Sequence, residues 1–313
     1  MTAKAYMFAT VKSDLRVRLL NMENEYILSV DNLCKTYPSF YLDHLSFKVK
    51  KGTIMGFIGR NGAGKTTTLK SLVNLIRKDS GTVEMFNNDF FLNETQDKQR
   101  LSFLLGGIDY YQRTKIKNLT SVTRRFYKNW DENKYQHYLK AFELDENKSI
   151  KQLSNGMKMK YQLAVNLSHN AELLIFDEPT SGLDPVSRDE LLDLFLKIVS
   201  DGSRSILFST HITSDLEKCA DDITYISKGK ILLSLPEKEF ISSFTKFTGK
   251  KEDLDEKTEK SAMSIKEFKG NIEGVCWAKD KTENNMLRYE KPTLEDIMVF
   301  YERSQEENEE SII

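Results

Sequence analysis

Apolar and polar residues follow two different patterns along the first two thirds of the chain. Over residues 25–37 and 41–49 they alternate, which predicts two half-exposed strands that pair in antiparallel fashion. Later runs are continuously apolar and are separated by segments of helical character: residues 54–58, 173–176, 206–208 and 223–226. Such runs are typical of a parallel sheet covered on both faces, so the pattern predicts an α/β fold.

The same pattern divides the chain into three parts. We expect a flexible N-terminal extension over residues 1–25, in which Met22 is the natural start, and a main domain over residues 26–235. Within the main domain, residues of about 107–165 are rich in helix formers and predict a helical insert. An accessory region over residues 236–313 follows the main domain.

The accessory region has a polar beginning and an amphipathic end. Residues 248–260 are dense in Lys, Glu and Asp, which predicts a solvated linker or helix face. A small appendage is expected to resume near Ile265. Residues 292–301 have the signature of a capped amphipathic helix, and the acidic tail from Gln305 is expected to fray.

Composition excludes several classes of protein. The 313 residues include 46 basic and 47 acidic side chains, a net charge of −1, so no overall field favours nucleic acid or an anionic membrane. Cys34, Cys219 and Cys276 are far apart and lack metal-ligand spacing, which fits a reducing cytosol. No run approaches the roughly 20 apolar residues that span a bilayer. Residues 1–21 lack the apolar centre of a secretory signal.

A glycine-rich loop joins the run at 54–58 to a helical segment. It reads Gly59-Arg60-Asn61-Gly62-Ala63-Gly64-Lys65-Thr66, and Thr67 follows. Glycines let backbone N–H groups converge on phosphate oxygens, the helix start adds partial positive charge, and the lysine adds a full one. The threonine hydroxyl stands where Mg²⁺ needs an oxygen ligand. An ordinary glycine-rich turn is the alternative, but the flanking strand and helix favour a nucleoside triphosphate site.

Two consecutive carboxylates, Asp177 and Glu178, follow the apolar run at 173–176. At the carboxyl edge of a parallel sheet they would lie beside the glycine-rich loop, with Asp177 directed to Mg²⁺ and Glu178 to an attacking water. The alternative is that both are turn residues before Pro179.

Two weaker signals flank these carboxylates. Ser154-Asn155-Gly156 opens a helical run, and a helix start with a hydroxyl and free N–H groups is an anion site, although ordinary helix starts look the same. His211 ends the run that begins at 206; alone, it is more often an ordinary polar residue at a strand end.

Taken together, these motifs resemble the nucleotide-binding domain of ATP-binding cassette (ABC) transporters over residues 26–234. The loop at 59–66 resembles the Walker A motif, residues 153–157 the signature, and residues 176–178 the Walker B motif. Residues 181–184, which end in Asp184, resemble the D-loop, and His211 the switch histidine. Tyr37 stands where the family has an aromatic residue that stacks on adenine.

The resemblance implies a fold and a mechanism. The fold would be that of a P-loop NTPase with a RecA-like core, an antiparallel β subdomain, a helical insert and a small C-terminal appendage. Two such domains would enclose two ATP molecules with Mg²⁺, so that Ser154, Asn155 and Gly156 of one chain face the γ-phosphate bound by Lys65 of the other. Glu178 would be the general base, His211 would contact the γ-phosphate, Asp184 would belong to the nucleotide site, and Thr66 and Asp177 would hold the metal.

The resemblance also implies partners and a place in the cell. They are a separate integral-membrane permease and a second ABC subunit, identical or different. The protein would then be cytoplasmic and peripheral on the inner face of the cell membrane, and no nucleic acid is expected. Residues 151–160 and 127–131 look most like bacterial exporters of antibiotics and peptides. The rival is a soluble ABC ATPase that acts on nucleic acid or ribosomes.

The sequence departs from the family pattern at two places. The signature has Asn155 and Met157 where the commonest form has Gly and Gln, but Ser154 and Gly156 are kept. The glutamine loop, expected after residues 101–105, begins with two glycines, and Gln112 comes several residues later. This departure puts in doubt the usual contact of that glutamine with the metal and its usual coupling to the permease.

Overall fold

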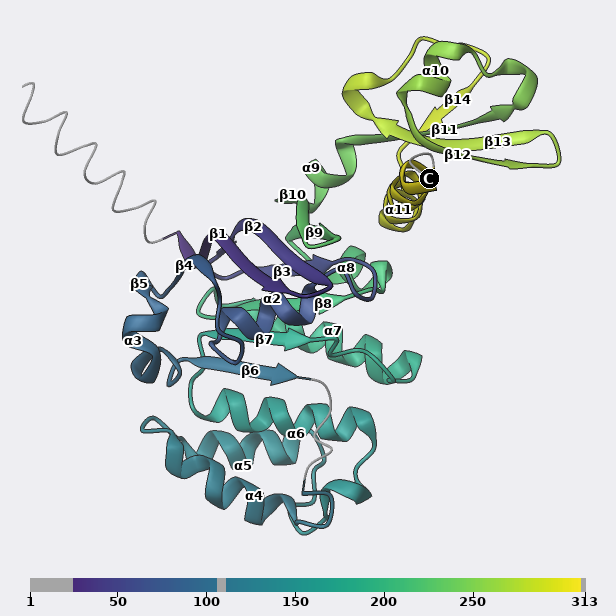
Figure 1. The fold of residues 1–313 in the computed structure, drawn as a ribbon. Helices are drawn as coiled ribbons and strands as arrows, with labels where there is room; N and C mark the ends of the chain where they lie inside the picture. The colour runs from purple at the N-terminus through teal and green to yellow at the C-terminus, as the bar shows by residue number, and fades with distance from the viewer. Residues whose placement is uncertain (1–24, 106–110, 311–313) are drawn as a thin grey trace, which may run out of the picture.

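The computed structural model describes residues 25–105 and 111–310 (Figure 1). The predicted extension up to residue 24, with the proposed start at Met22, lies outside the described residues. Among the helices that are described, none combines the length and hydropathy that a bilayer-spanning segment needs.

A six-stranded sheet forms the centre of the main domain, in the order β10-β9-β3-β8-β7-β6. Its strands are β3 (Ile54–Ile58), β6 (Leu101–Leu105), β7 (Leu173–Asp177), β8 (Ser205–Thr210), β9 (Asp222–Ser227) and β10 (Lys230–Pro236). Neighbours are parallel except β10, which pairs with β9 in antiparallel fashion. The four predicted parallel strands are thus confirmed as β3, β7, β8 and β9, and every one of their residues is buried.

A second sheet packs on the first and is antiparallel, as the alternating pattern predicts. It consists of β1 (Tyr26–Tyr37), β2 (Phe40–Lys50), β4 (Ser80–Met85) and β5 (Asn88–Asp89), in the order β2-β1-β4-β5. Its buried face contributes Leu28 and Val30 to one apolar cluster with Phe57 of β3 and Leu69 of the following helix. This cluster fixes both ends of the glycine-rich loop.

Helices cover the central sheet and form the insert at the bottom of Figure 1. They are α2 (Lys65–Leu72), α3 (Phe90–Asp97), α4 (Ile116–Thr123), α5 (Glu132–Ala141), α6 (Asn155–Ser168), α7 (Pro185–Val199) and α8 (Thr213–Cys219), with short 3₁₀ turns at Arg124–Phe126 and Ile150–Gln152. The predicted helical insert consists of α4, α5 and α6, packed around Ile116, Tyr135 and Tyr161.

The accessory region folds around a third sheet, in the order β12-β13-β11-β14. Its elements are α9 (Glu237–Ser242), β11 (Phe244–Lys250), α10 (Glu256–Ser261), β12 (Ala262–Phe268), β13 (Asn271–Trp277), β14 (Arg288–Glu290) and α11 (Leu294–Glu310), with 3₁₀ turns at Lys251–Asp253 and Ala278–Asp280. Phe247, Ile272 and Leu287 form a small apolar core beneath this sheet.

Two expectations for this region are wrong. Residues 248–250 end β11 and are not a linker, although the prediction of a helix face holds for α10. The charged stretch looked like a linker because Phe244 and Phe247 are the only buried residues of β11. They lie on opposite faces of the strand, Phe244 in the main core cluster and Phe247 in the small accessory core, so no alternating apolar pattern marks the strand. The tail from Gln305 was expected to fray, yet α11 continues to residue 310.

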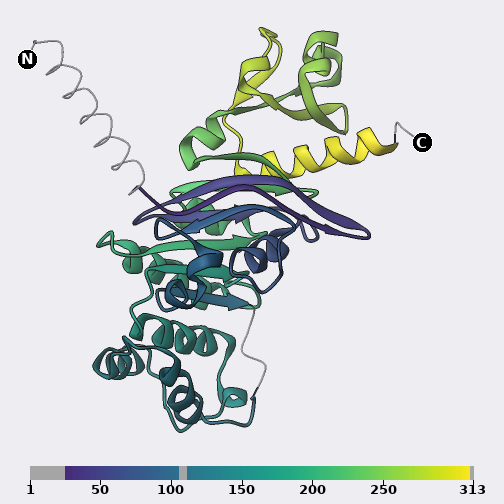
Figure 2. The ribbon, with the colours of Figure 1, turned by 60° about the vertical axis from the view of Figure 1, so that its left-hand side comes forward.

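The predicted C-terminal helix is confirmed as α11, and it is built into the core of the main domain. Its start is capped: Asp296 N–H donates to Thr293 Oγ1 and Thr293 N–H donates to Asp296 Oδ2, both at 3.0 Å. Leu294, Ile297 and Phe300 join one buried cluster with Ile58 of β3 and other core residues of the main domain. Figure 2 shows α11 in yellow between the accessory sheet above and the other two sheets below.

Candidate active site

The glycine-rich loop leaves β3 and turns back into α2. Gly62 and Gly64 have φ values of 84° and 113°, which only glycine adopts without strain. A Cβ on Gly59 would lie 2.2 Å from the carbonyl oxygen of Ile226, so only glycine fits there. Inside the curl, Lys65 Nζ donates to the carbonyl oxygens of Gly59 at 2.7 Å and Arg60 at 3.3 Å. These two hydrogen bonds hold the Lys65 side chain inside the curled backbone of the loop.

Asp177 lies where β7 ends, next to the loop. Its Oδ2 accepts from Thr66 Oγ1 at 2.7 Å, and its Oδ1 accepts from Ser209 Oγ at 2.6 Å. The pairing of β7 with β8 places Asp177 directly beside Ser209. Only 8% of the residue is exposed. Both oxygens are therefore fixed by neighbours, and one of them faces the threonine hydroxyl of the loop.

Glu178 has a left-handed backbone, with φ of 51°, unusual for a residue other than glycine. Ser209 holds this conformation, since its carbonyl oxygen and Oγ both accept from Glu178 N–H, at 3.1 and 3.0 Å. The turn points the carboxylate at two cationic or polar partners: Oε1 is 3.2 Å from Lys65 Nζ, and Oε2 is 2.8 Å from His211 Nδ1. Asp177 and Glu178 are adjacent in sequence, but their carboxylates contact different groups of the site.

These groups meet in a hollow of about 540 Å³, which we call the nucleotide hollow. Its size is within the usual range for small-molecule sites, roughly 300–1,000 Å³. Nine of the predicted site residues line it: Arg60, Asn61, Gly62, Gly64, Lys65, Thr66, Thr67, Glu178 and His211. Phe40 and Ser181 complete the lining. Gly59, Ala63 and Asp177 are not in the lining but lie beside it in the loop and the strand.

The residues present fit a nucleotide with Mg²⁺. Thr66 Oγ1 and Asp177 Oδ2 are two oxygen donors 2.7 Å apart, and Mg²⁺ bound with a nucleotide takes one or two protein oxygens and completes its shell from phosphate and water. Among the described residues, no group of three or more His, Cys, Asp or Glu side chains could hold a metal alone.

Several predicted site residues are not brought into the hollow. Ser154 caps α6, its Oγ accepting from Met157 N–H at 3.2 Å, and Ser154 and Asn155 are exposed. Asn155 Nδ2 donates to Gly182 O at 3.3 Å, so the signature lies against the D-loop of its own chain. Gly156 lies nearby, since a Cβ there would be 3.2 Å from Ser187 Oγ. Their role in binding phosphate stays a prediction.

Asp184 also has hydrogen-bond partners within its own chain. It caps α7, accepting from Val186 N–H, Ser187 N–H and Ser187 Oγ. The hydrogen bond from the Ser187 hydroxyl, aided by the backbone N–H groups, lowers the pKa of Asp184 below its usual value. The carboxylate is therefore anionic near neutral pH, and its place in the nucleotide site remains a prediction.

The aromatic residue at the hollow is Phe40. Tyr37 pairs with Phe40 across the tip of the β1–β2 hairpin, is 38% exposed, and has Lys35 Nζ 5.4 Å from its ring centre. Phe40 packs on the loop itself, since a Cβ on Gly64 would come within 2.9 Å of its Cζ. Its position between the two alternating segments at 25–37 and 41–49 gave no chemical signal, because a strand-end phenylalanine is ordinary.

Ser209 was also missed by the sequence reasoning. It donates to the carboxylate of Asp177 and accepts from the backbone N–H of Glu178, yet a serine inside an apolar strand carries no distinctive pattern. The available signal was its register: it lies two residues before His211, at the end of the strand next to β7. The glutamine-loop glycines lie outside the described residues. The carbonyl oxygen of Gln112 accepts a hydrogen bond from Lys151 N–H at 2.9 Å.

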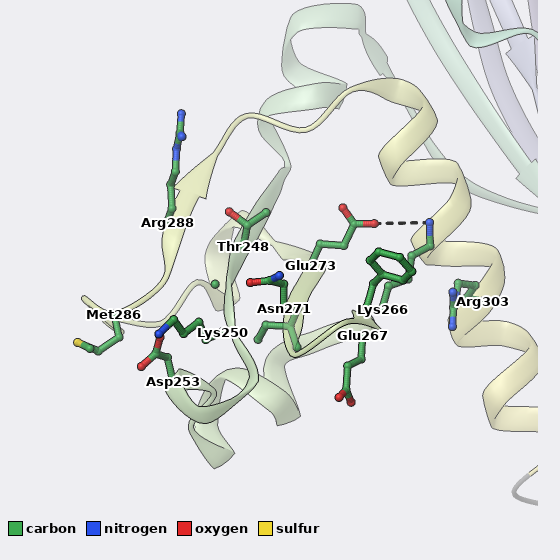
Figure 3. A pocket seen from close by; sticks show the side chains of 13 residues that line it. Thr248, Lys250, Asp253, Lys266, Glu267, Asn271, Glu273, Met286, Arg288 and Arg303 are labelled. Atoms are coloured by element: carbon green, nitrogen blue, oxygen red, sulfur yellow. Dashed lines mark ion pairs between the residues drawn. The ribbon is translucent and has the colours of Figure 1, made fainter.

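A larger hollow, of about 930 Å³, lies in the accessory region (Figure 3). We call it the accessory hollow; it is lined mainly by β11, β12 and β13, with Met286, Arg288 and Arg303 at its edges. Lys266 lies 3.7 Å from Glu273, the ion pair drawn in Figure 3, and Phe268 is exposed at the tip of the β12–β13 hairpin. Its charges do not converge on one point, unlike those of the nucleotide hollow.

Comparison with known proteins identifies the family to which this chain belongs. Residues 42–181 match the family model described as ABC transporter. The chain is 34% identical over 213 residues to the bacitracin transport ATP-binding protein BcrA of Bacillus licheniformis, a match that covers 67% of this chain and 70% of that protein. The chain belongs to the ATP-binding cassette family. It is therefore an ATPase and the ATP-binding subunit of an ABC transporter.

Other members of the cassette family are similar over the same share of the chain. The lantibiotic transport ATP-binding protein SrtF of Streptococcus pyogenes is 32% identical to the chain, and the match covers 69% of this chain and 93% of that protein. A solved ATP-binding subunit of an ABC transporter has a TM-score of 0.61 at 24% identity, covering 68% of this chain and 91% of that one. A dimeric cassette bound to ADP and Pi has a TM-score of 0.59 at 20% identity, covering 67% and 98%. These structures confirm the P-loop NTPase fold.

Proposed function

We propose that this cassette hydrolyses ATP to drive a separate membrane permease in the export of an antibiotic, a peptide or another small compound. The observation that carries the proposal is the convergence of Lys65, Glu178 and His211 on one hollow beside the Thr66–Asp177 pair. Support for the cargo class comes from the relatives, one named for bacitracin transport and another for lantibiotic transport.

The side chains divide the chemistry among them. Lys65 and the loop N–H groups bind phosphate oxygens, while Thr66 and Asp177 hold Mg²⁺, which neutralises charge on the phosphates when bound. Glu178 accepts the proton of an attacking water, because its side chain lines the hollow and its backbone N–H is held by Ser209. His211 orients that carboxylate through the 2.8 Å contact.

We further propose that two cassettes form the working unit around two ATP molecules. Ser154 and Asn155 are exposed and absent from the lining of their own chain's hollow, so they are available to the phosphate of a partner. The start of α6 offers the positive end of a 14-residue helix to that anion. The partner is a second copy or a related chain.

Sizing of the Glu178→Gln variant tests this arrangement. With Mg-ATP present we expect a dimer, because nucleotide then stays intact between the subunits, and the further change Ser154→Arg should return it to monomer by placing bulk at the interface. A dimer that is indifferent to ATP and to Ser154→Arg would contradict the shared site.

Exposed apolar side chains near the helical insert support a permease partner. Leu92 on α3 is 84% exposed and Phe126 after α4 is 71% exposed. Gln99 ties the two segments together by donating to Phe126 O at 2.9 Å. Large exposed apolar side chains on adjacent segments often mark a protein interface. Such a contact would place the chain on the inner face of the cell membrane.

Affinity purification from native membranes tests the partner. We expect a polytopic membrane protein to be recovered with the wild-type chain and lost with Leu92→Ser plus Phe126→Ser, while ATP binding is unchanged. Recovery of ribosomes or DNA in place of a membrane protein would favour the rival function. Expression with that permease in a sensitive host, challenged with bacitracin or a lantibiotic, then tests the cargo; resistance that persists in Glu178→Gln would contradict it.

A further inference from the structure

Helix α11 reaches from the accessory region to the phosphate-binding loop. Arg60, the second residue of the loop, forms an ion pair with Glu306 through its Nη1. Close by, Lys228 Nζ, in the turn between β9 and β10, donates to the carbonyl oxygen of Gln305 at 3.4 Å. Arg60 and Glu306, 246 positions apart in sequence, are thus in direct contact at the nucleotide site.

A second carboxylate of α11 anchors the helix at this place. Glu302 is 7% exposed, and its Oε1 accepts from the hydroxyl of Tyr225 at 2.8 Å. Tyr225 lies on β9 directly beside Ile58, the last residue of β3 before the loop. Burial and the neighbouring Glu302 raise the pKa of Tyr225, which keeps its hydroxyl a donor. Glu306 is one helical turn further on, so the anchor sets its position beside Arg60.

Both cations of the loop therefore have carboxylate partners from the chain itself. Lys65 has the catalytic Glu178, and Arg60 has Glu306 of the accessory region. A polyphosphate that binds these cations must share or replace those partners. The side chains of Arg60 and Glu306 are 54% and 56% exposed, and exposed ion pairs contribute little net free energy, so this pair opens at small cost.

We propose that Glu306 is a positioning residue for Arg60: it draws the guanidinium toward α11 and away from the phosphates, and so lowers the affinity of the cassette for nucleotide. Because Arg303 of the same helix lines the accessory hollow (Figure 3), α11 lies between the two hollows and connects the accessory region to nucleotide binding. The inference rests on nucleotide binding at residues 59–66 but not on the permease or the cargo.

Calorimetric titration of the full chain tests the proposal. Glu306→Gln removes the charge at constant size and should tighten binding of Mg-ATP by roughly two- to fivefold, the scale of one exposed ion pair. Binding of adenosine, which has no phosphate, should not change. Glu306→Asp keeps the charge and should restore most of the wild-type affinity. Glu295→Gln, an exposed glutamate in the first turn of the same helix, is the matched control and should behave as wild type. Unchanged or weaker ATP binding in Glu306→Gln would overturn the proposal.

Two further measurements separate this proposal from a general effect on folding or on the site. In an Arg60→Gln background, Glu306→Gln should have no additional effect on ATP affinity; a persistent effect would show that Arg60 is not the route. Amide hydrogen exchange at residues 300–306 should quicken on addition of Mg-ATP, and unchanged exchange would count against the pair opening. Loss of nucleotide binding in Lys65→Ala, by contrast, tests the site itself and is independent of Glu306.

Discussion

The two hollows of the molecule differ in size and in how their charged side chains are arranged. The accessory hollow is the larger, but its ion pairs, such as Lys266 with Glu273, lie along its walls without a common focus. The nucleotide hollow is smaller, and there Lys65 and His211 both contact the carboxylate of Glu178. Convergent, partly buried charges mark a reactive site better than volume does. The predictions below test this contrast, from the largest expected effect to the smallest.

Glu178→Gln should give the largest effect. Loss of the general base is expected to slow ATP hydrolysis by about 10² to 10⁴, while nucleotide affinity survives, because the amide keeps the size of the side chain. Steady-state turnover and equilibrium binding measure the two separately. Glu283→Gln, an exposed glutamate of the accessory region, is the matched control and should hydrolyse ATP normally. Near-normal turnover in Glu178→Gln would refute the assignment.

Lys65→Ala should weaken binding itself, by roughly 100-fold, since a charge-assisted hydrogen bond to phosphate is lost. Titration with Mg-ATP measures the change. Lys70→Ala, on the same helix α2 but outside the lining of the hollow, serves as the control. If both variants bind ATP equally well, the loop is not the phosphate site.

Acid should destabilise the main domain through His169. This residue is buried, with its ring stacked on Tyr127 at 3.7 Å, and burial lowers its pKa to about 4. Between the unfolded value of about 6.5 and the folded value, only the unfolded chain binds the proton, so stability falls as the pH drops through this window. Over the whole window the loss is about 3 kcal/mol.

Urea unfolding at pH 7 and pH 4.5 checks this sign. In His169→Gln the free energy of unfolding should differ less between the two pH values. In His137→Gln, which changes an exposed histidine of α5, the difference should stay as in wild type. All four histidines lie in the main domain, so the accessory region should not contribute a histidine-linked loss. An equal acid loss in His169→Gln would contradict the explanation.

Phe40→Ala should have the smallest of these effects, about a tenfold loss of ATP affinity, the usual scale of one base stacked on an aromatic ring. Tyr37→Ala should cost less, because Tyr37 is not in the lining of the hollow. A larger loss in Tyr37→Ala would restore the family pattern and show that the hairpin tip moves when nucleotide binds.

The apolar runs were sufficient to predict four of the parallel strands, though not β6, and, with the loop and Walker B motifs, most of the nucleotide hollow. Continuous burial makes most positions of these strands apolar, and phosphate binding restricts the loop to particular residues, so both leave a strong local signal. The accessory sheet was misread because β11 buries only Phe244 and Phe247, and polar and charged residues dominate the local pattern. Ser209 and Phe40 carried no signal because their roles depend on strands that are adjacent only in space.

By itself, the sequence determined the order of the motifs, the fold class and the chemistry of the hollow, because local patterns of burial and phosphate recognition are written in neighbouring residues. Tertiary structure alone decided that Ser209 fixes the carboxylate of Asp177 and the backbone of Glu178, that Ser154 lies outside its own chain's hollow, and that Glu306 contacts Arg60. These contacts join segments from different strands, helices and regions, and only packing brings such segments together.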